Sequence, residues 1–361
     1  MDKKIVISAQ NIYEGGPLTI LNIAVESLIE RIKKNHLIIF VSNKNLIDKK
    51  IRSKNIKIIE IPNSRKNFLY RIYYEFLYFK KFSKKEKPDI WISLQDILPN
   101  VDAKKKIVYC HTPIAFYDMK MRDIYFEPFC FFRSMFYKFI YNTKVYKKST
   151  IIVQQEWIKN IFKTKFRCKN IIVNKPFFNF KENNKYNYKK KNNDIIFFYP
   201  SLPRFQKNFE VIVKACKFLN KPIKKFKIYF TFSKNENRYS KYISKISKNV
   251  PQIKFIGRKK HVEILKIYKK TSLLIFSSKL ETWGLPLSEA MYSKIPIIAS
   301  NMSYARETLL GYKKKIFFDP DNHIKLANIL NNFLLNKKLF KNNNKNFIIK
   351  NNLHKLWSVI L

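Results

Sequence analysis

Two glutamates, Glu281 and Glu289, stand in the segment whose residue types most clearly suggest chemistry. Gly284 permits a sharp turn after a strand-like run that ends near Ser277, and Pro286 suits the first position of a helix, where its missing N–H costs nothing. Glu281 is therefore expected in the loop at the carboxyl end of a strand, and Glu289 about one turn into the helix. Both carboxylates can then face the crevice where open α/β sheets bind ligands, and the helix N-terminus can bind an anion. An ordinary βα loop with one solvated and one capping glutamate would fit the same spacing.

Two cations, Arg204 and Lys207, form a second candidate cluster just after the strand-like run 195–199. A guanidinium and an ammonium group at such a strand end can clamp a diphosphate. Lysine is abundant in this chain, so a pair of this kind also arises by chance. The spacing alone leaves both interpretations open.

The first half of the chain offers a glycine pair and a histidine. Gly15 and Gly16 precede a helical stretch that starts near Leu18. A double glycine lets the backbone approach a ligand, and the helix N-terminus can face a phosphate or an acceptor. His111 follows a strand-like run at 106–110. A glycine turn or a lone histidine is often structural, so these residues are candidates.

A D-x-D pattern, formed by Asp319 and Asp321, is the one motif that suggests a divalent cation. Its position after a last strand and before a terminal helix favours a loop and a helix N-cap instead. The cysteines at 110, 130, 168 and 216 are too far apart for a metal knuckle or a redox pair, and we expect reduced thiols. The sequence thus predicts no metal site and no cofactor.

Short β-rich runs alternate with helical stretches in both halves, which predicts parallel sheets covered by helices. The expected strands are 4–8, 36–41, 56–61, 90–94, 106–110, 150–153, 195–199, 227–231, 254–256, 273–277 and 295–299. The expected helices are 18–33, 68–81, 209–219, 262–268 and 287–292. We expect an α/β fold with two Rossmann-like doubly wound domains that face each other across a cleft. They span 1–180 and 195–340, with a polar linker at 181–194 and a C-terminal helix at 341–361 that packs back toward the first domain.

The formal net charge of +48, from 73 Lys+Arg against 25 Asp+Glu, is extreme. Such a field attracts nucleic acid or an anionic membrane. Abundant Lys, Asn, Ile, Phe and Tyr beside only 5 Gly is also the signature of an A+T-rich coding sequence. No nucleic-acid-reading motif is recognisable, and the basic-aromatic runs have helical spacing, so nucleic acid is not an expected partner.

Two stretches, 65–87 and 126–148, interleave aromatic with basic residues. They could be interfacial helices that dock on anionic lipid, or core helices with solvated basic faces, and the sequence favours neither. No apolar run is long enough for a spanning helix, and the first residues lack the apolar region of a signal peptide. The expected location is the cytoplasm, with peripheral contact to the inner face of the membrane as an option.

The segment Glu281–Met291 resembles the signature of the family 4 glycosyltransferases, which are retaining enzymes of the glycosyltransferase B fold. Further matching segments follow the family's order: Phe255-Ile256-Gly257, Ile297–Ser300, Glu307 and Phe317–Asp321. The likeness covers essentially all of 195–330 and, more loosely, the whole chain. The sequence differs from the family's pattern in the segment that ends at Arg204, where Pro-Ser-Leu-Pro-Arg stands in place of the family's frequent Gly-Arg-Leu.

The resemblance implies a role for each candidate. Glu281 would hold hydroxyls of the donor sugar, and Glu289 the ribose of the nucleotide. Arg204 and Lys207 would bind the diphosphate. The remaining donor-site candidates are His111, which would contact the sugar from the first domain, and the backbone at Gly15, Gly16, Gly257, Gly284 and Leu285.

The implied reaction transfers a sugar from a nucleoside diphosphate sugar to an acceptor hydroxyl with retention at the anomeric carbon. The acceptor would be a glycan or lipid-linked glycan, as in bacterial surface polysaccharide or lipopolysaccharide assembly. The domain at 195–340 would bind the donor, and the domain at 1–180 would lie on the acceptor side. Two alternatives stay open: a nucleotide-sugar epimerase or phosphorylase of the same fold, because fold does not fix function, and a basic nucleic-acid-binding protein.

Overall fold

The computed structural model describes residues 3–30, 36–48, 56–176, 195–219, 224–335, 339–340 and 357. The chain divides into two compact units. Unit 1 comprises Met1–Phe116, Arg133–Phe177 and Ile349–Leu361, and unit 2 comprises Tyr117–Phe132 and Phe178–Ile348. Residues 117–132, which the sequence-based boundaries assign to the first domain, thus group with the second unit. The expected linker at 181–194, and the expected helix at 341–361 apart from Trp357, lie outside the described residues.

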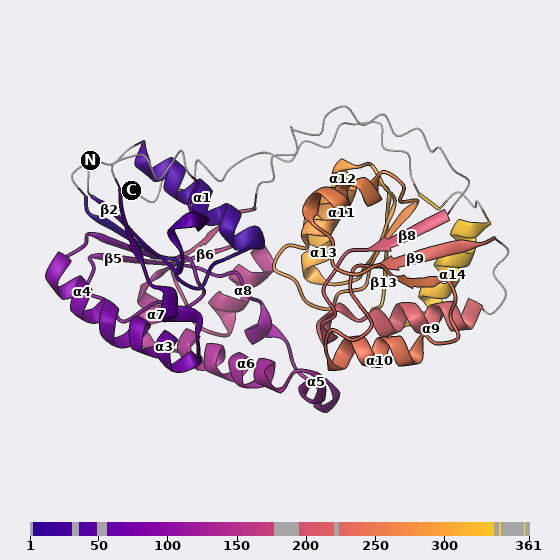
Figure 1. Cartoon of the computed structure of the whole chain (residues 1–361), viewed down its shortest axis with the longest axis horizontal. Coiled ribbons are helices and arrows are strands. Elements are labelled where there is room, and N and C mark those ends of the chain that lie inside the picture. The colour runs from indigo at the N-terminus through magenta and orange to yellow at the C-terminus, as the bar shows by residue number, and fades with distance from the viewer. Residues whose placement is uncertain are drawn as a thin grey trace. The chain divides into compact units, whose positions relative to one another are not determined.

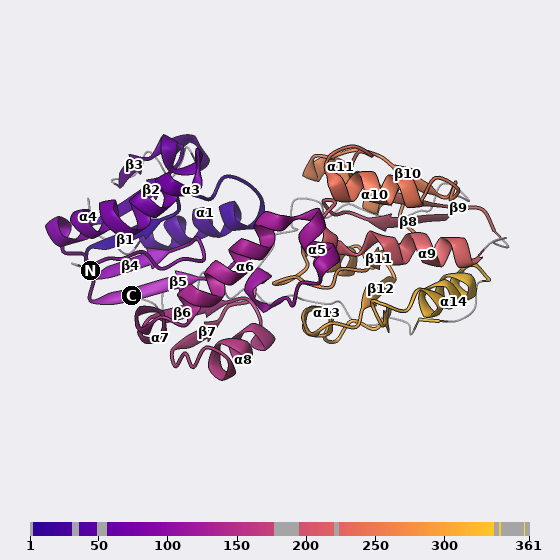
Figure 2. The same ribbon diagram turned by 90° about the horizontal axis from the view of Figure 1, so that it is seen from below.

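The described part of unit 1 holds a parallel sheet (Figure 1). Its strand order is β3-β2-β1-β4-β5-β6-β7, which can be followed in Figure 2. The strands are β1 (Ile5–Ser8), β2 (Leu37–Val41), β3 (Lys57–Glu60), β4 (Ile90–Ser93), β5 (Lys105–Tyr109), β6 (Thr150–Val153) and β7 (Ile171–Val173). Ile5 of β1 pairs with Leu37 on one side and with Ile90 on the other. The order therefore reverses direction at β1 and β4, which is the switch point of a doubly wound sheet.

Alternate side chains of β1 enter two different cores, because successive residues of a strand point to opposite faces. Ile5 and Ile7 pack in one buried cluster with α1 (Gly15–Ile29) and Trp357. Val6 packs in a second cluster that includes Phe79 and Trp91. Both faces of the sheet are covered, which explains why its strands read as nearly continuous apolar runs.

One continuous helical segment packs against the Val6 side of the sheet. It consists of α3 (Phe68–Ile72), a π-helical stretch η3 (Tyr73–Tyr78) and α4 (Phe79–Glu86). Lys87, with a φ of 45°, ends it in the left-handed conformation. Among the described residues before 177, the other helices are η1 (Lys44–Leu46), η2 (Pro62–Arg65), η4 (Ile114–Phe116), α5 (Met121–Phe126), α6 (Pro128–Tyr141), α7 (Lys144–Lys148) and α8 (Glu156–Thr164).

Unit 2 repeats this plan in its described residues, with the parallel strand order β10-β9-β8-β11-β12-β13 (Figure 2). The strands are β8 (Ile195–Tyr199), β9 (Phe226–Phe230), β10 (Ile253–Phe255), β11 (Leu273–Phe276), β12 (Ile297–Ser300) and β13 (Lys315–Phe318). The helices are η6 (Phe205–Lys207), α9 (Phe209–Leu219), α10 (Arg238–Ile246), α11 (His261–Tyr268), α12 (Leu285–Tyr292), α13 (Ser303–Thr308) and α14 (His323–Leu334). The predicted α/β fold with two Rossmann-like doubly wound domains is confirmed. No described helix has the length and apolarity that crossing a membrane requires.

Candidate functional site

The turn from β11 into α12 depends on Gly284. This residue is the N-cap of α12 and has a φ of 79°, in the left-handed region that favours glycine. A Cβ there would lie 3.2 Å from Leu287 Cδ1 and 3.4 Å from ring atoms of Phe276 and Tyr304. Conformation and available space both select glycine, and Leu285 begins the helix directly afterwards.

Hydrogen bonds hold the rest of this loop in place. Trp283 Nε1 donates to Ser288 Oγ at 2.8 Å, and Thr308 Oγ1 donates to the carbonyl of Trp283 at 2.6 Å. Tyr304 donates its hydroxyl to the carbonyl of Ser278 at 2.6 Å. The loop that carries Glu281 is therefore fixed by neighbouring elements, as a binding site requires.

Lys207 and Glu281 form an ion pair between the loop that follows β8 and the loop that follows β11. Their side chains are 16% and 17% exposed, so a ligand can reach both. β8 pairs with β11, and the strand order of the second sheet reverses there. The pair thus lies at the carboxyl ends of the strands at the switch point, where open α/β sheets bind ligands.

The two loops are also joined through their backbones. Ser277 Oγ lies 3.0 Å from the carbonyls of both Lys207 and Asn208, and Tyr199 donates its hydroxyl to the carbonyl of Lys207 at 2.8 Å. The N–H of Lys279 donates to the carbonyl of Gln206 at 2.7 Å. These bonds fix the base of the lysine and leave its ammonium group beside Glu281.

Arg204 does not join this ion pair. Its Nη1 lies 3.9 Å from Glu127 Oε2, and its side chain is 42% exposed. The N–H of Lys207 donates to the carbonyl of Arg204 at 2.9 Å, so the two cations share one short turn.

Glu289 lies on α12, and its Oε1 is 3.0 Å from Nε2 of His261, the first residue of α11. This hydrogen bond raises the pKa of His261 above its ordinary value. Because the folded-state pKa is raised, the pairing stabilises the fold at low pH, and this contribution is lost as the pH rises through that pKa. No sequence motif pointed to His261, since its partner lies on another helix.

Gly257 follows β10 in the loop that leads to His261. It has a φ of 71°, and its N–H donates to the carbonyl of Phe232 at 3.4 Å. The glycine therefore has a conformational reason to be there. It shapes the approach to α11.

The D-x-D pattern forms a local turn. Asp319 Oδ1 accepts the N–H of Asp321 at 2.9 Å, and Asp321 pairs with Lys279, whose hydrogen bond lowers the pKa of that carboxyl group. Asn322 caps α14 by accepting the N–H of Lys325 at 2.8 Å. In the described part of the chain, no group of three or more His, Cys, Asp or Glu residues is arranged to hold a metal ion.

In unit 1, α1 begins at Gly15, earlier than the start predicted near Leu18. Gly15 has a φ of 68°, in the left-handed region that favours glycine. Gly16 consequently lies in the first turn of the helix, where backbone N–H groups have no intrahelical acceptor. The glycine pair thus forms part of a helix N-terminus at the carboxyl end of β1.

His111 follows β5 and is held through its backbone. The carboxylate of Asp96, a residue with a φ of 68°, accepts the N–H groups of His111 and Thr112. The imidazole stacks on Tyr109, with ring centroids 4.5 Å apart, and its Nε2 has no hydrogen-bond partner among the described residues. Burial lowers the pKa of His111, although Asp96 acts in the opposite direction.

A buried polar network at the switch point of the first sheet was not predicted from the sequence. Glu75 on η3 is fully buried, and its Oε1 lies 3.0 Å from Arg71 Nε. The same oxygen accepts a hydrogen bond from the side-chain amide of Asn11 at 3.3 Å and another from that of Gln95 at 3.2 Å. Its Oε2 has no partner among the described residues. Burial raises the pKa of Glu75 to about 7, while Arg71 favours the ionised form. Asn11 and Gln95 follow β1 and β4, so the network lies where a first-domain ligand would bind.

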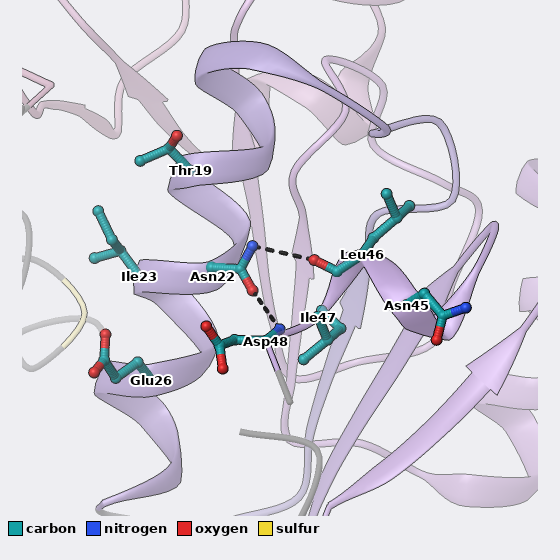
Figure 3. A pocket seen from close by; sticks show the side chains of 8 residues that line it. All are labelled: Thr19, Asn22, Ile23, Glu26, Asn45, Leu46, Ile47 and Asp48. Carbon is teal, nitrogen blue, oxygen red and sulfur yellow. Dashed lines mark hydrogen bonds between the residues drawn. The ribbon is translucent and has the colours of Figure 1, made fainter. Parts of the chain in front are cut away.

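A pocket of about 660 Å³ opens elsewhere in unit 1, between α1 and η1 (Figure 3). Asn22 joins these elements: it donates to the carbonyl of Leu46 at 3.2 Å and accepts the N–H of Asp48 at 3.1 Å. Glu26 and Asp48 line the pocket, and their carboxylates would repel a diphosphate. None of the sequence-predicted site residues lies in its wall.

A known protein family resembles the chain in sequence, and known structures resemble it in fold. Residues 179–350 match the model of the family described as glycosyl transferases group 1. No curated protein is significantly similar to the chain in sequence. Similar folds occur in solved structures of a glycosyltransferase from Rickettsia africae ESF-5, of Anabaena Alr3699/HepE in complex with UDP-glucose, and of WaaG, a glycosyltransferase involved in lipopolysaccharide biosynthesis.

The three structures resemble the chain over nearly its whole length. The Rickettsia enzyme has a TM-score of 0.65 at 17% identity and covers 93% of this chain and 88% of its own. Alr3699/HepE has a TM-score of 0.59 at 14% identity, and the match covers 93% of this chain and 91% of that protein. WaaG has a TM-score of 0.66 at 11% identity, and the match covers 98% of this chain and 93% of WaaG. At such identities the likeness establishes the fold. Residues 179–350 thus match the group 1 glycosyltransferase family, and the chain has the glycosyltransferase B fold.

Proposed function

We propose that the chain is a retaining glycosyltransferase that moves a sugar from a nucleoside diphosphate sugar to a hydroxyl of a glycan or lipid-linked glycan. The observation that carries the proposal is the ion pair between Lys207 and Glu281 at the switch point of the second sheet. In a sugar nucleotide, the sugar hydroxyls and the diphosphate adjoin each other across the anomeric carbon. A carboxylate that accepts hydroxyl hydrogen bonds, directly beside an ammonium group that binds phosphate oxygens, suits both sides of that linkage.

The other candidates would complete the donor site. Glu289 would accept hydrogen bonds from the ribose, and Arg204 would bind the diphosphate. His111, whose Nε2 has no hydrogen-bond partner among the described residues, suits a sugar hydroxyl. The backbone N–H groups of the remaining candidates would contact the donor, and these are Gly15, Gly16, Gly257, Gly284 and Leu285.

The reaction breaks the bond between the anomeric carbon and the phosphate oxygen and forms a bond from the acceptor oxygen to the same face of that carbon. The departing phosphate oxygen takes the acceptor's proton, so no protein nucleophile is needed. Negative charge grows on the diphosphate as it leaves. Lys207, Arg204 and the N-terminus of α12 would stabilise that charge more in the transition state than in the ground state.

The acceptor side would be the carboxyl edge of the first sheet. Asn11, Glu75 and Gln95 gather polar atoms there, and Glu75 keeps one carboxylate oxygen without a partner among the described residues. Such groups suit the hydroxyls of a glycan. A role in bacterial surface polysaccharide or lipopolysaccharide assembly agrees with the description of WaaG, whose fold is similar.

A donor screen followed by product analysis tests the function. We expect one class among UDP-, GDP-, ADP- and TDP-sugars to raise the melting temperature, because a ligand at 100 times its Kd stabilises the folded state by about 2.7 kcal/mol. With that donor and a glycan acceptor, the anomeric proton coupling in the NMR spectrum of the product should show the configuration of the donor. An inverted product would refute retention, and stabilisation by DNA with no sugar nucleotide effect would refute the function.

Activity should survive removal of divalent metal. Lys207, Arg204 and a helix N-terminus supply the positive charge that a metal ion supplies in other transferases. Turnover in EDTA should therefore equal turnover in the untreated protein, within about twofold. Loss of activity in EDTA, restored by Mn²⁺, would contradict this and would make Asp319 and Asp321 the first residues to examine.

A further inference from the structure

The outer side of the segment α3–η3 carries an exposed apolar stripe. Leu69, Tyr73 and Leu77 follow one another at intervals of four residues and are 74%, 48% and 57% exposed. Residues at this spacing lie on one face of a helix. The stripe is therefore a continuous surface rather than a set of scattered apolar side chains.

Helix α6 carries a second stripe. Its exposed apolar residues are Phe129, Phe132, Met135 and Phe139, between 54% and 86% exposed. In a helix with 3.6 residues per turn they fall within about a third of the circumference. More than half of the large apolar side chains that are exposed in the described part of the chain lie between residues 69 and 145.

The inner sides of the two helices meet. Tyr137 of α6 interacts with Arg71 of α3, and Arg71 in turn pairs with the buried Glu75. Burial raises the pKa of Tyr137 to about 12. Figure 1 shows α3, α4 and the part of α6 in unit 1 on the side of the sheet opposite α1. The polar groups thus fasten the helices to the sheet, while the apolar stripes point away from the core.

Positive charge accompanies the stripes. Residues 128–148 contain no Asp or Glu but include Arg133, Lys138, Lys144, Lys147 and Lys148. On α4, Lys81, Lys84 and Lys85 are exposed at the end of the segment that carries the first stripe. Exposed aromatic and aliphatic side chains flanked by lysines are the composition of helices that lie in the surface of an anionic bilayer.

We propose that the stripes of α3–η3 and α6, with the flanking lysines, form a docking face for an anionic lipid bilayer. The apolar side chains would enter the boundary between headgroups and acyl chains, and the lysines would bind lipid phosphates. A protein partner for this face would need a surface that is both acidic and apolar in a matching arrangement. An anionic bilayer offers negative charge and an apolar interior at every point of its surface. The proposal goes beyond the reaction proposed above, because it rests on the surface of the helices and not on the donor site.

Sedimentation of the whole chain with vesicles tests the proposal. We expect binding to vesicles of phosphatidylglycerol and phosphatidylcholine at 0.1 M salt, and loss of most of it at 1 M salt, where the Debye length falls from about 10 Å to about 3 Å. The double variant F132S/F139S and the triple variant K81E/K84E/K85E should each bind on the order of tenfold or more weakly. Circular dichroism and the melting temperature establish that each variant is folded.

Matched controls come from unit 2. Val262 and Leu310 are 64% and 69% exposed, and Lys241, Lys245 and Lys248 are exposed lysines near α10. The variants V262S/L310S and K241E/K245E/K248E should keep wild-type vesicle binding. Equal losses in the control and stripe variants, equal binding to neutral vesicles, or no binding to any vesicle would overturn the proposal. If the chain forms a dimer without vesicles and the variant F132S/F139S is monomeric, the face binds a second copy of the chain and not a bilayer.

Discussion

Replacing Glu281 by glutamine should lower kcat by on the order of 10²-fold and leave the affinity for the free nucleoside diphosphate nearly unchanged. The carboxylate would hold sugar hydroxyls most strongly as positive charge develops at the anomeric carbon, so a neutral amide loses transition-state stabilisation. The free diphosphate has no sugar for Glu281 to contact. The substitution also releases Lys207 from its ion pair, which leaves the ammonium group available to phosphate.

The measurement combines steady-state kinetics with equilibrium titration of the matching diphosphate. Glu263→Gln is a suitable control, since Glu263 caps α11 through the N–H of Lys260 and lies outside the proposed donor contacts. Loss of diphosphate binding in Glu281→Gln, with turnover of the remaining complex intact, would show that this glutamate binds the nucleotide and not the sugar. If Glu281→Gln shows wild-type kinetics, the segment that contains Glu281 is a structural loop with no part in the reaction.

Glu289→Gln should weaken the binding of the nucleoside diphosphate by about 1–3 kcal/mol, because a charged hydrogen bond to the ribose is lost. That range corresponds to a rise in Kd of roughly 5- to 150-fold. The same change should lower the pKa of His261 toward its ordinary value, because the hydrogen bond from Glu289 is what raises it. Both effects follow from a single carboxylate, although they are measured in different states of the protein.

Titration calorimetry gives the first quantity, and an NMR pH titration of the His261 ring protons gives the second. Glu263→Gln, on the same helix as His261, should change neither. If Glu289→Gln keeps full diphosphate affinity while Glu281→Gln loses it, the proposed roles are reversed. If the pKa of His261 stays raised without Glu289, the contact seen between the two side chains is not the cause.

Sequence reasoning located the second domain's loops well because their chemistry is local. A glycine that must adopt a left-handed φ, followed by a helix start, identifies the turn after β11 without any tertiary information. Lys207 could likewise be predicted as a site residue from local sequence, since it follows the strand-like run of β8. The contact between Lys207 and Glu281 requires the strand order, which brings β8 beside β11, and periodicity alone does not supply that order.

Other features depend on tertiary structure. Glu75 lies in an aromatic run that reads as an ordinary amphipathic helix, and only the folded chain brings it to Asn11 and Gln95. His261 contacts Glu289 only because α11 packs beside α12. β13 (Lys315–Phe318) is not among the strands predicted from the sequence, although a loop was expected at Asp319 directly after it.

The π-helical stretch η3 has a consequence for the rotational phase of the helix that contains it. Its wider turn, in which the N–H of Phe79 bonds to the carbonyl of Tyr74, takes up one residue more than an α-turn would. Each residue of an α-helix advances the chain by about 100° around the axis. If the same residues formed a regular α-helix in place of η3, everything after it would therefore be rotated by about a quarter turn relative to Arg71. Phe79 would leave the core beneath Phe40 and Trp91, and the lysines of α4 would point in another direction. The extra residue thus sets which way two parts of one helix face.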